Sequence, residues 1–244
     1  MNGPGKGLGG GKVNRRGNGP PRRGWILREG YPFIAPPLLI ALVGYVMAWP
    51  RLGMLALAAG VGVAIFFRNP ARRPLRLPGL ALAPADGRVV EIAQLESLEG
   101  AIGPVAKVSI FMSVFNVHVN RSPVAGEVVE VRHEPGAFRP AYRDETSRQN
   151  ERNLVRIRMG DGHGVICVQV AGVLARRIVC WVQEGARLAM GAPLGMIRFG
   201  SRVDCYFPPG FDVDVRVGQR VWGGETVIGY FPGFSPQGKV SPGP

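Results

Sequence analysis

The feature that most constrains this chain is a long apolar stretch near its N-terminus. From residue 33 to residue 67 the sequence carries a single charge, that of Arg51. The Pro50-Arg51 pair divides the stretch into two apolar runs, 32–49 and 52–67. Each run is slightly shorter than the roughly 20 residues that a straight membrane-spanning helix needs. We therefore expect residues 25–67 to form a membrane-associated helical hairpin.

Arginines on both sides of the stretch indicate how such a hairpin would be oriented. Basic residues are enriched on the cytoplasmic side of membrane segments, so we expect both ends of the hairpin at the cytoplasmic face of the cell membrane. Two other arrangements remain open. One is a single interfacial or re-entrant insertion, and the other is a secretory signal peptide, which a second apolar run would not normally follow. The flanking residues are Arg15, Arg16, Arg22, Arg23, Arg68, Arg72 and Arg73.

The net charge of +13 is concentrated outside the part that is expected to fold. Residues 1–80 hold 12 Lys/Arg and one acid, whereas residues 81–244 hold 18 Lys/Arg and 16 acids. A nucleic-acid-binding domain would carry its basic patch on the folded part, so we expect an anionic membrane surface as a partner and no nucleic acid. Residues 1–24 are expected to be a disordered basic tail, and residues 68–79 a basic linker against anionic headgroups.

The remainder of the sequence is typical of short strands and turns. The chain contains 36 Gly and 22 Pro, which favour turns over long soluble helices. Period-two alternation predicts strands over 88–92, 106–112, 126–133, 154–159, 164–171, 177–182 and 193–199. Helices are considered only for 94–100 and 144–153. We expect one β domain over residues 80–233 and a flexible tail over 234–244.

An internal repeat refines the expected fold. The pattern Gly185-x-x-Leu188-x-x-Gly191-x-x-Leu194 recurs further along the chain, beginning at Gly218. Such turns, with the segments 84–89 and 123–128, resemble those of lipoyl and biotinyl carrier domains. The fold class is therefore expected to be mainly β, a barrel-sandwich domain preceded by an N-terminal hydrophobic helical hairpin. No lysine occupies the hairpin tip where lipoate or biotin would attach, so the carrier function does not follow.

Few side chains in this domain are suited to catalysis. Ser201 follows Gly200, His118 lies where an apolar strand gives way to a polar turn, and Asp86 lies in Pro-Ala-Asp-Gly. A hydroxyl, an imidazole and a carboxylate form a generic nucleophile set, but each residue also has an ordinary structural interpretation, such as a hydrogen-bonded histidine or an Asx-turn. No Gly-x-Ser-x-Gly elbow surrounds Ser201, which argues against an ordinary serine hydrolase. We expect no metal, because His163 and Cys167 have a suitable spacing for two ligands but a third and a fourth ligand are missing.

Five blocks of sequence together resemble the phosphatidylserine decarboxylase family, in its short bacterial and archaeal branch. The resemblance covers roughly residues 60–231, and Arg198-Phe199-Gly200-Ser201-Arg202 is its most specific part. The blocks are Asp86 in Pro-Ala-Asp-Gly, residues 111–123, Asp144 leading into 150–153, residues 170–179, and residues 195–204.

The resemblance implies a proenzyme that cleaves itself between Gly200 and Ser201. Residues 1–200 would become the β chain and residues 201–244 the α chain of a heterodimer, with Ser201 converted into a covalent pyruvoyl cofactor. His118, oriented by Asp86, would be the base for Ser201. The pyruvoyl carbonyl would form a Schiff base with membrane phosphatidylserine, and loss of CO₂ would give phosphatidylethanolamine in phospholipid biosynthesis. His118 would then reprotonate the carbanion.

One position departs from the family pattern. Long-branch relatives carry His-x-x-His in this block, and the second His is matched here by Arg121. Either His118 serves both maturation and decarboxylation, or Arg121 holds a substrate phosphate or carboxylate. Two other kinds of protein remain as alternatives: a non-catalytic, membrane-tethered β-sandwich and a membrane serine peptidase using Ser201. A higher homo-oligomer is left open.

Overall fold

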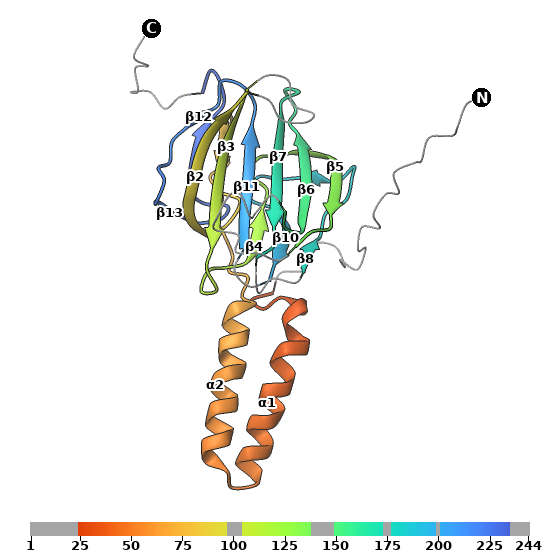
Figure 1. Ribbon diagram of the computed structural model, residues 1–244, viewed down its shortest axis with the longest axis vertical. Coiled ribbons are helices and arrows are strands. Elements are labelled where there is room, and N and C mark those ends of the chain that lie inside the picture. Colours follow the sequence, from red (N-terminus) through yellow and green to blue (C-terminus); the bar gives the residue numbers. More distant parts are fainter. Residues whose placement is uncertain (1–23, 97–103, 138–148, 173–176, 199–200, 235–244) are drawn as a thin grey trace, which may run out of the picture.

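The computed structural model describes residues 24–96, 104–137, 149–172, 177–198 and 201–234. The strands form a β domain, and a hairpin of two helices extends from one end of it (Figure 1). The mainly β fold class and the apolar N-terminal helix that were expected from the sequence are confirmed.

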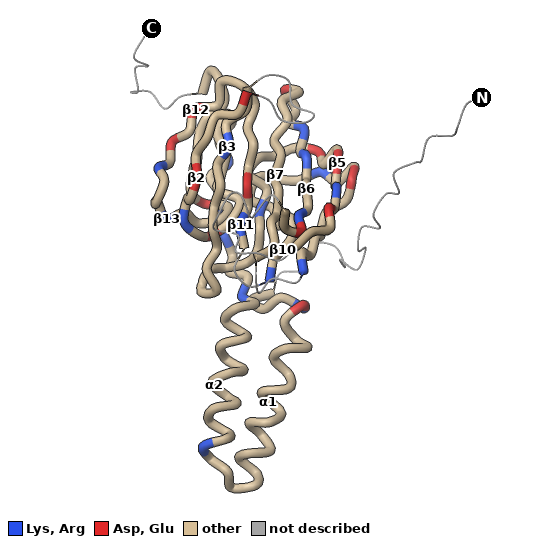
Figure 2. The backbone as a smooth tube through the Cα atoms, viewed as in Figure 1, with Lys and Arg blue, Asp and Glu red and all other residues tan. Residues whose placement is uncertain are grey.

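The hairpin consists of α1 (Tyr31–Val46), preceded by the 3-10 turn η1 (Arg28–Gly30), and α2 (Pro50–Phe66). The two helices pack closely at Gly44, where an added Cβ would lie 2.9 Å from the backbone nitrogen of Gly53, a small-residue contact of the kind found between membrane helices. The segment Arg28–Val46 is long and apolar enough to cross a membrane, and Pro50–Phe66 is apolar but shorter. Figure 2 shows the hairpin almost free of charge, apart from Arg51 near its turn.

In the described residues, fourteen strands form three antiparallel sheets. The largest has eight strands in the order β13-β2-β3-β11-β7-β6-β5-β9, and the two smaller ones have the orders β1-β14-β12 and β4-β10-β8. The strands are β1 (Leu80–Leu82), β2 (Gly87–Leu95), β3 (Val105–Met112), β4 (Val119–Arg121), β5 (Gly126–Glu134), β6 (Arg152–Arg158), β7 (Gly164–Val170), β8 (Ile178–Cys180), β9 (Arg187–Leu188), β10 (Pro193–Ile197), β11 (Ser201–Phe207), β12 (Asp212–Val213), β13 (Arg220–Val221) and β14 (Val227–Tyr230).

The main core lies between the concave face of the curled eight-stranded sheet and the two smaller sheets. Alternate residues of β11, such as Val203 and Cys205, point into it, as period-two side-chain alternation requires. They meet Leu194 from β10 and Ile228 from β14, which are also fully buried. Burial of this apolar cluster is the main stabilising contribution to the β domain.

The internal repeat corresponds to two structurally equivalent halves. The backbone N–H of Gly185 donates to Val128 O, and that of Gly218 donates to Val89 O, both at 2.8 Å. Likewise β10 pairs with β4 and β14 pairs with β1. The repeat glycines at 185, 191, 218 and 224 have φ between 76° and 89°, a left-handed conformation that glycine adopts without steric cost. The repeated glycine pattern therefore marks a duplicated strand–turn–strand unit.

The seven strands expected from alternation are present as β2, β3, β5, β6, β7, β8 and β10, with shifted ends. Both helices considered from the sequence are wrong in their described parts, because Gln94 and Leu95 end β2, and Arg152 and Asn153 begin β6. The rest of those two segments lies partly outside the described residues. Strand β11, which begins at Ser201, was not expected.

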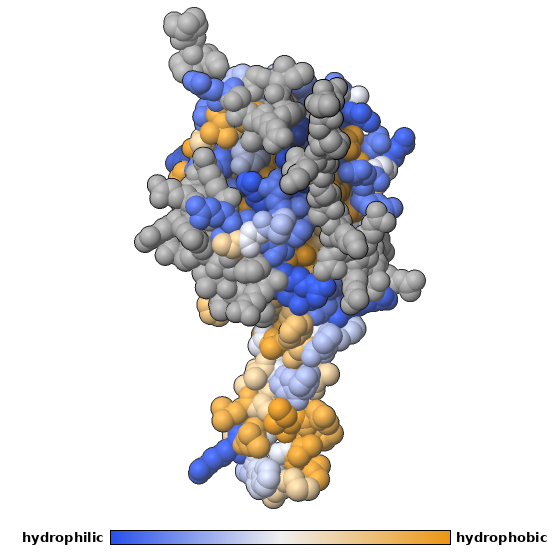
Figure 3. Space-filling view, turned by 45° about the vertical axis from the view of Figure 1, so that its right-hand side comes forward, coloured by the Kyte–Doolittle hydropathy of each residue, from blue (hydrophilic) through white to orange (hydrophobic). Residues whose placement is uncertain are grey.

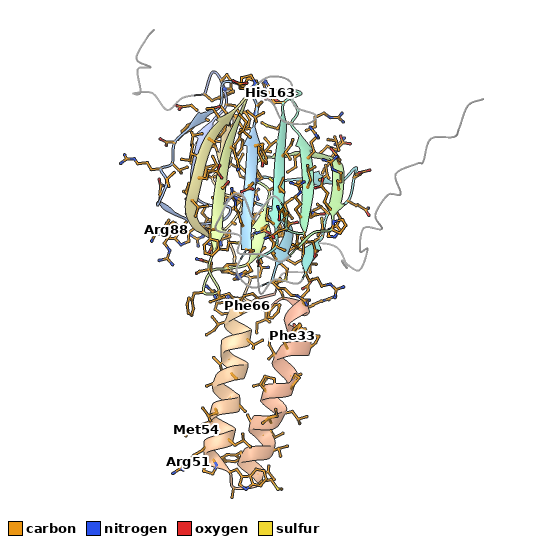
Figure 4. All side chains as sticks on the ribbon, viewed as in Figure 1. Phe33, Arg51, Met54, Phe66, Arg88 and His163 are labelled. Atoms are coloured by element: carbon orange, nitrogen blue, oxygen red, sulfur yellow. The ribbon has the colours of Figure 1, made fainter. Side chains whose placement is uncertain are left out.

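A second apolar cluster joins the hairpin to the β domain. Phe66 and Phe67 at the end of α2 pack against Val119 of β4 and Met196 of β10. Trp181 belongs to the same cluster, and its Nε1 donates to Glu29 Oε1 at 2.8 Å. Figure 4 shows Phe33 and Phe66 at this junction and His163 at the opposite end of the β domain. The hairpin is thus packed against one end of the domain rather than joined to it by a chain alone.

Candidate active site

Ser201 is the first residue of β11, directly opposite Met112 of β3. Its side chain is fully buried, and among the described residues its Oγ has no hydrogen-bond partner. Leaving a buried hydroxyl unpaired costs about 1–3 kcal/mol, so such a group in a folded protein requires an explanation. Gly200, the residue expected to precede the cleaved bond, lies outside the described residues.

His118 lies just before β4 and is 1% exposed. Its Nδ1 is 2.9 Å from the carbonyl oxygen of Asn116. Because a carbonyl only accepts hydrogen bonds, Nδ1 carries the proton of the neutral ring. Nε2 then presents a lone pair, and this buried atom has no partner among the described residues. The ring of Phe66 covers the imidazole, with the ring centroids 4.2 Å apart.

The electrostatic surroundings of His118 keep its imidazole neutral. Burial lowers its pKa to about 4, the hydrogen bond to Asn116 raises the pKa in part, and the nearby charge of Arg68 lowers it further. A histidine with this pKa is unprotonated at neutral pH, so its Nε2 is available as a general base.

The sheet topology brings His118 and Ser201 to the same end of the β domain. The His118 carbonyl accepts the N–H of Ile197, at the end of β10, at 3.4 Å, and the chain then leads from β10 into β11. Asn120, two residues after His118, donates to the Sδ of Met112 at 3.5 Å. Met112 is the residue that pairs with Ser201. Two buried polar side chains, each with an atom that lacks a hydrogen-bond partner in the described part of the chain, therefore lie at the end of the domain that carries the hairpin.

Asp86 lies at this end of the eight-stranded sheet, directly before β2, but it is engaged elsewhere. Both of its carboxylate oxygens accept from Arg72 Nη2, at 2.9 and 2.7 Å, and Oδ1 also accepts the N–H of Gly223 at 2.8 Å. In the described structure it is therefore Asn116, and not Asp86, that orients the His118 ring. A catalytic role for Asp86 stays a prediction.

Arg121 is committed to the segment that follows the hairpin. Its Nη2 donates to Asn69 Oδ1 at 2.8 Å and to Pro70 O at 3.2 Å, and its Nη1 donates to Gly191 O at 3.2 Å. Burial and the neighbouring Arg72 lower its pKa to about 10, so it remains charged at neutral pH. Its guanidinium stabilises the docked linker, and its expected contact with substrate stays a prediction.

Two site residues were not singled out from the sequence. Arg72 was expected to face headgroups with the rest of the linker, but its side chain is buried in ion pairs with Asp86 and Glu225. Asn116 lies in a turn in which its own Oδ1 accepts from the N–H and the Oγ of Ser113. A Ser-x-x-Asn turn directly before the histidine was the available signal for Asn116. Nothing in the sequence distinguishes Arg72 from its arginine neighbours.

We expect Arg72→Met to destabilise the protein. Removing one partner of a buried ion pair leaves the other charge uncompensated, which here would cost about 3 kcal/mol. Urea unfolding of the protein in detergent micelles, followed by tryptophan fluorescence, would measure the loss. The exposed Arg76 of the same linker provides the control, and equal unfolding of Arg72→Met and Arg76→Met would show that the ion pairs contribute nothing.

The fold and the site define a class: a mainly β protein with an N-terminal apolar hairpin and a buried serine and histidine at the hairpin end. Residues 62–229 match the model of the phosphatidylserine decarboxylase family. Three similar relatives all bear the name phosphatidylserine decarboxylase proenzyme. The relative from Mycobacterium marinum is 50% identical, covering 83% of this chain and 85% of its own. Those from Mycolicibacterium gilvum and Mycobacterium tuberculosis (strain CDC 1551) are 47% and 49% identical, covering 83% and 82% of this chain and 88% and 87% of their own.

The chain therefore belongs to the phosphatidylserine decarboxylase family. The resemblance described from the sequence is confirmed, as is the expectation of an enzyme of this family.

Proposed function

We propose that this protein cleaves itself between Gly200 and Ser201 and then decarboxylates phosphatidylserine to phosphatidylethanolamine and CO₂ with a pyruvoyl group derived from Ser201. The observation that carries the proposal is a pair of buried atoms at one end of the β domain, Ser201 Oγ and His118 Nε2, neither of which has a hydrogen-bond partner among the described residues. A nucleophile and a neutral base need unused hydrogen-bonding capacity, because their partners arrive during the reaction. Family membership supports the same chemistry.

Maturation would begin with Ser201. His118 Nε2 takes the hydroxyl proton, Oγ bonds to the Gly200 carbonyl carbon, and the Gly200–Ser201 C–N bond breaks as the amine takes up a proton. The resulting ester then loses the Cα proton and the Cβ–O bond, which releases the carboxylate of Gly200. The dehydroalanine left at residue 201 tautomerises to an imine, and water hydrolyses that imine to a keto group with release of ammonia.

The group formed at residue 201 would supply an electron sink for the carbon that loses CO₂. The chain's own residues would supply proton control and exclusion of water. Because the low pKa of His118 favours the neutral ring, its Nε2 would carry a proton only briefly, between taking the proton up and returning it to the substrate. The rings of Phe66 and Phe67 and the side chain of Val119 close the hairpin side of the site to bulk water.

The hairpin would bring this site to its lipid substrate. Figure 3 shows hydrophobic residues gathered over the hairpin and hydrophilic residues over most of the visible β domain. Because the charged residues outside the hairpin flank it at its domain end, we propose that the hairpin inserts from the cytoplasmic face of the cell membrane. Phe66 ends α2 and touches His118, so the site would lie at headgroup level.

A denaturing gel with mass spectrometry tests the proposal. The purified protein is expected as two pieces, one ending at Gly200 and one beginning with a serine-derived residue that lacks its amine. Incubation with phosphatidylserine vesicles should release CO₂. A single intact chain of 26.2 kDa, or cleavage with an unmodified N-terminal serine, would contradict the pyruvoyl assignment, and peptide hydrolysis without CO₂ would favour a serine peptidase.

We also expect the two pieces to remain together after cleavage. The shorter piece would supply β11, which is hydrogen bonded to β3 on one side and β7 on the other, and β14, which pairs with β1. Separating the pieces would open the core of the domain, so both should elute as one species in size-exclusion chromatography without denaturant. Elution of the longer piece alone would contradict this expectation.

A further inference from the structure

The connection between β3 and β4 ends in an exposed apolar tip. Phe115 is 83% exposed, and its neighbour Val114 is 39% exposed. Figure 1 shows this connection at the end of the β domain that carries the hairpin. A single exposed phenylalanine is unremarkable on a soluble surface, but the carbonyl of this one is bonded to Arg68 at the end of α2. Both helices of the hairpin also carry exposed apolar side chains.

The tip is held level with the end of α2. Arg68 donates from Nη1 to Ile65 O, within the last turn of α2, and from Nη2 to Phe115 O, both at 2.7 Å. One guanidinium therefore bridges the helix end and the turn. The ring of Phe66 provides a second link between α2 and this part of the chain, because it packs against His118, which follows shortly after Phe115.

The length of the hairpin determines how close this end lies to a bilayer. Helices of 16 and 17 residues span about 24 and 26 Å at roughly 1.5 Å per residue. The hydrocarbon core of a bilayer is about 30 Å thick. A hairpin that is shorter than the core draws its domain end down to the interface, so residues level with Phe66 reach the acyl–headgroup boundary.

We infer that Val114 and Phe115 form a second membrane-inserting element, which dips into the phospholipid interface beside the hairpin. This inference rests on the proposed function for the identity of the membrane lipid. Phenylalanine is among the apolar side chains that interfacial elements bury at the boundary between headgroups and acyl chains. The Asn116 carbonyl orients His118 within the protein itself, so the insertion would serve to dock the site on the substrate's membrane.

Fluorescence quenching by brominated lipid tests the insertion directly. The full-length variants Phe115→Trp and Phe234→Trp each add one tryptophan at an exposed apolar position. The N–H of Phe234 donates to Phe231 O at 3.1 Å, and the ring of Phe231 faces His163 at the end of the β domain opposite the hairpin. Both would be reconstituted in vesicles of phosphatidylserine and phosphatidylcholine, with or without bromine on the acyl chains. The tryptophan added at 115 should be quenched and that at 234 should not, over the same native background. Equal quenching of the two variants would overturn the inference.

Activity provides an independent test. Phe115→Ser should lower decarboxylation of vesicle phosphatidylserine about tenfold at limiting lipid, the factor expected when one large apolar side chain loses its burial. The variant should cleave itself normally and turn over monomeric short-chain phosphatidylserine at the wild-type rate. Equal loss on both substrates would assign Phe115 a local structural role, and lipid-independent cross-linking between Phe115→Cys copies would assign it to a dimer contact; either result overturns the inference. If wild-type protein releases no CO₂ but the quenching difference persists, only the proposed function fails.

Discussion

Ser201→Ala is expected to give a single uncut chain that releases no CO₂ from phosphatidylserine. In the proposed mechanism, the substitution removes the one atom, Oγ, that attacks the Gly200 carbonyl and then leaves with the Gly200 carboxylate. Without it no pyruvoyl group can form, so no partial activity should remain. It should also leave the fold intact, because the Oγ of Ser201 makes no hydrogen bond with the described residues. Gel electrophoresis and a ¹⁴CO₂ release assay would measure the two losses.

A matched variant separates this chemistry from the removal of a buried hydroxyl in general. The Oγ of Ser122 is also buried, but it donates to Val124 O at 2.6 Å. Ser122→Ala should therefore lose about 1 kcal/mol of stability and keep both cleavage and decarboxylation. Cleavage of Ser201→Ala at the same bond, or CO₂ release by that variant, would sink the pyruvoyl assignment.

His118→Gln is expected to slow self-cleavage by a factor of about 10² to 10⁴, the usual contribution of a general base. In the wild-type precursor the pH dependence should reveal the unusual pKa. Because burial lowers the His118 pKa to about 4, the base form persists below neutral pH. The cleavage rate should stay level as pH falls through 6.5 and should drop only as pH approaches 4. Pulse-labelled precursor from cell-free translation, transferred to buffers across this range, would give the profile.

His163→Gln serves as the control for that experiment. His163 is exposed at the far end of the β domain, where its N–H and ring contact Asp161. Its removal should leave the cleavage rate and the pH profile unchanged. A wild-type profile that falls with a midpoint near pH 6.5 would mean that the base is a solvated histidine and not buried His118.

The strands that could be recognised from the sequence either have one face in the core and the other toward solvent, or, like β3 and β7, are buried on both faces and consist mainly of apolar residues. Strand β2 and strand β6 show this alternation, so a period-two pattern predicts them. Strand β11 is different, because its outward-facing Arg202 and Asp204 are buried in a polar cluster with Glu91. Charged residues in a strand that is buried on both faces resemble the sequence of a loop, because the partners that neutralise them are known only from the tertiary structure.

The candidate site also contains residues that the sequence predicts and contacts that it does not predict. The resemblance to the family predicts Ser201 and His118 as site residues, and the structure places both at one end of the domain. The partners of Asp86 and Arg121 could not be predicted, because each is bound by a linker whose basic residues look equivalent in the sequence. Arg72 differs from the other arginines of the linker in that its side chain is buried, and this burial depends on long-range packing.

Strand β11 has a mechanical consequence for a cofactor made by chain cleavage. A freshly cut N-terminus normally gains conformational freedom, and a reactive group on it would sample many positions. Residue 201 is instead paired with Met112, and the strand behind it is bonded on both sides along its length. The new terminus would keep the restricted motion of a strand interior. In the proposed enzyme, the pairing of β11 with β3 and β7 would hold residue 201 in position after the peptide bond before it is broken. Cleavage of the chain would therefore create the cofactor without increasing its mobility.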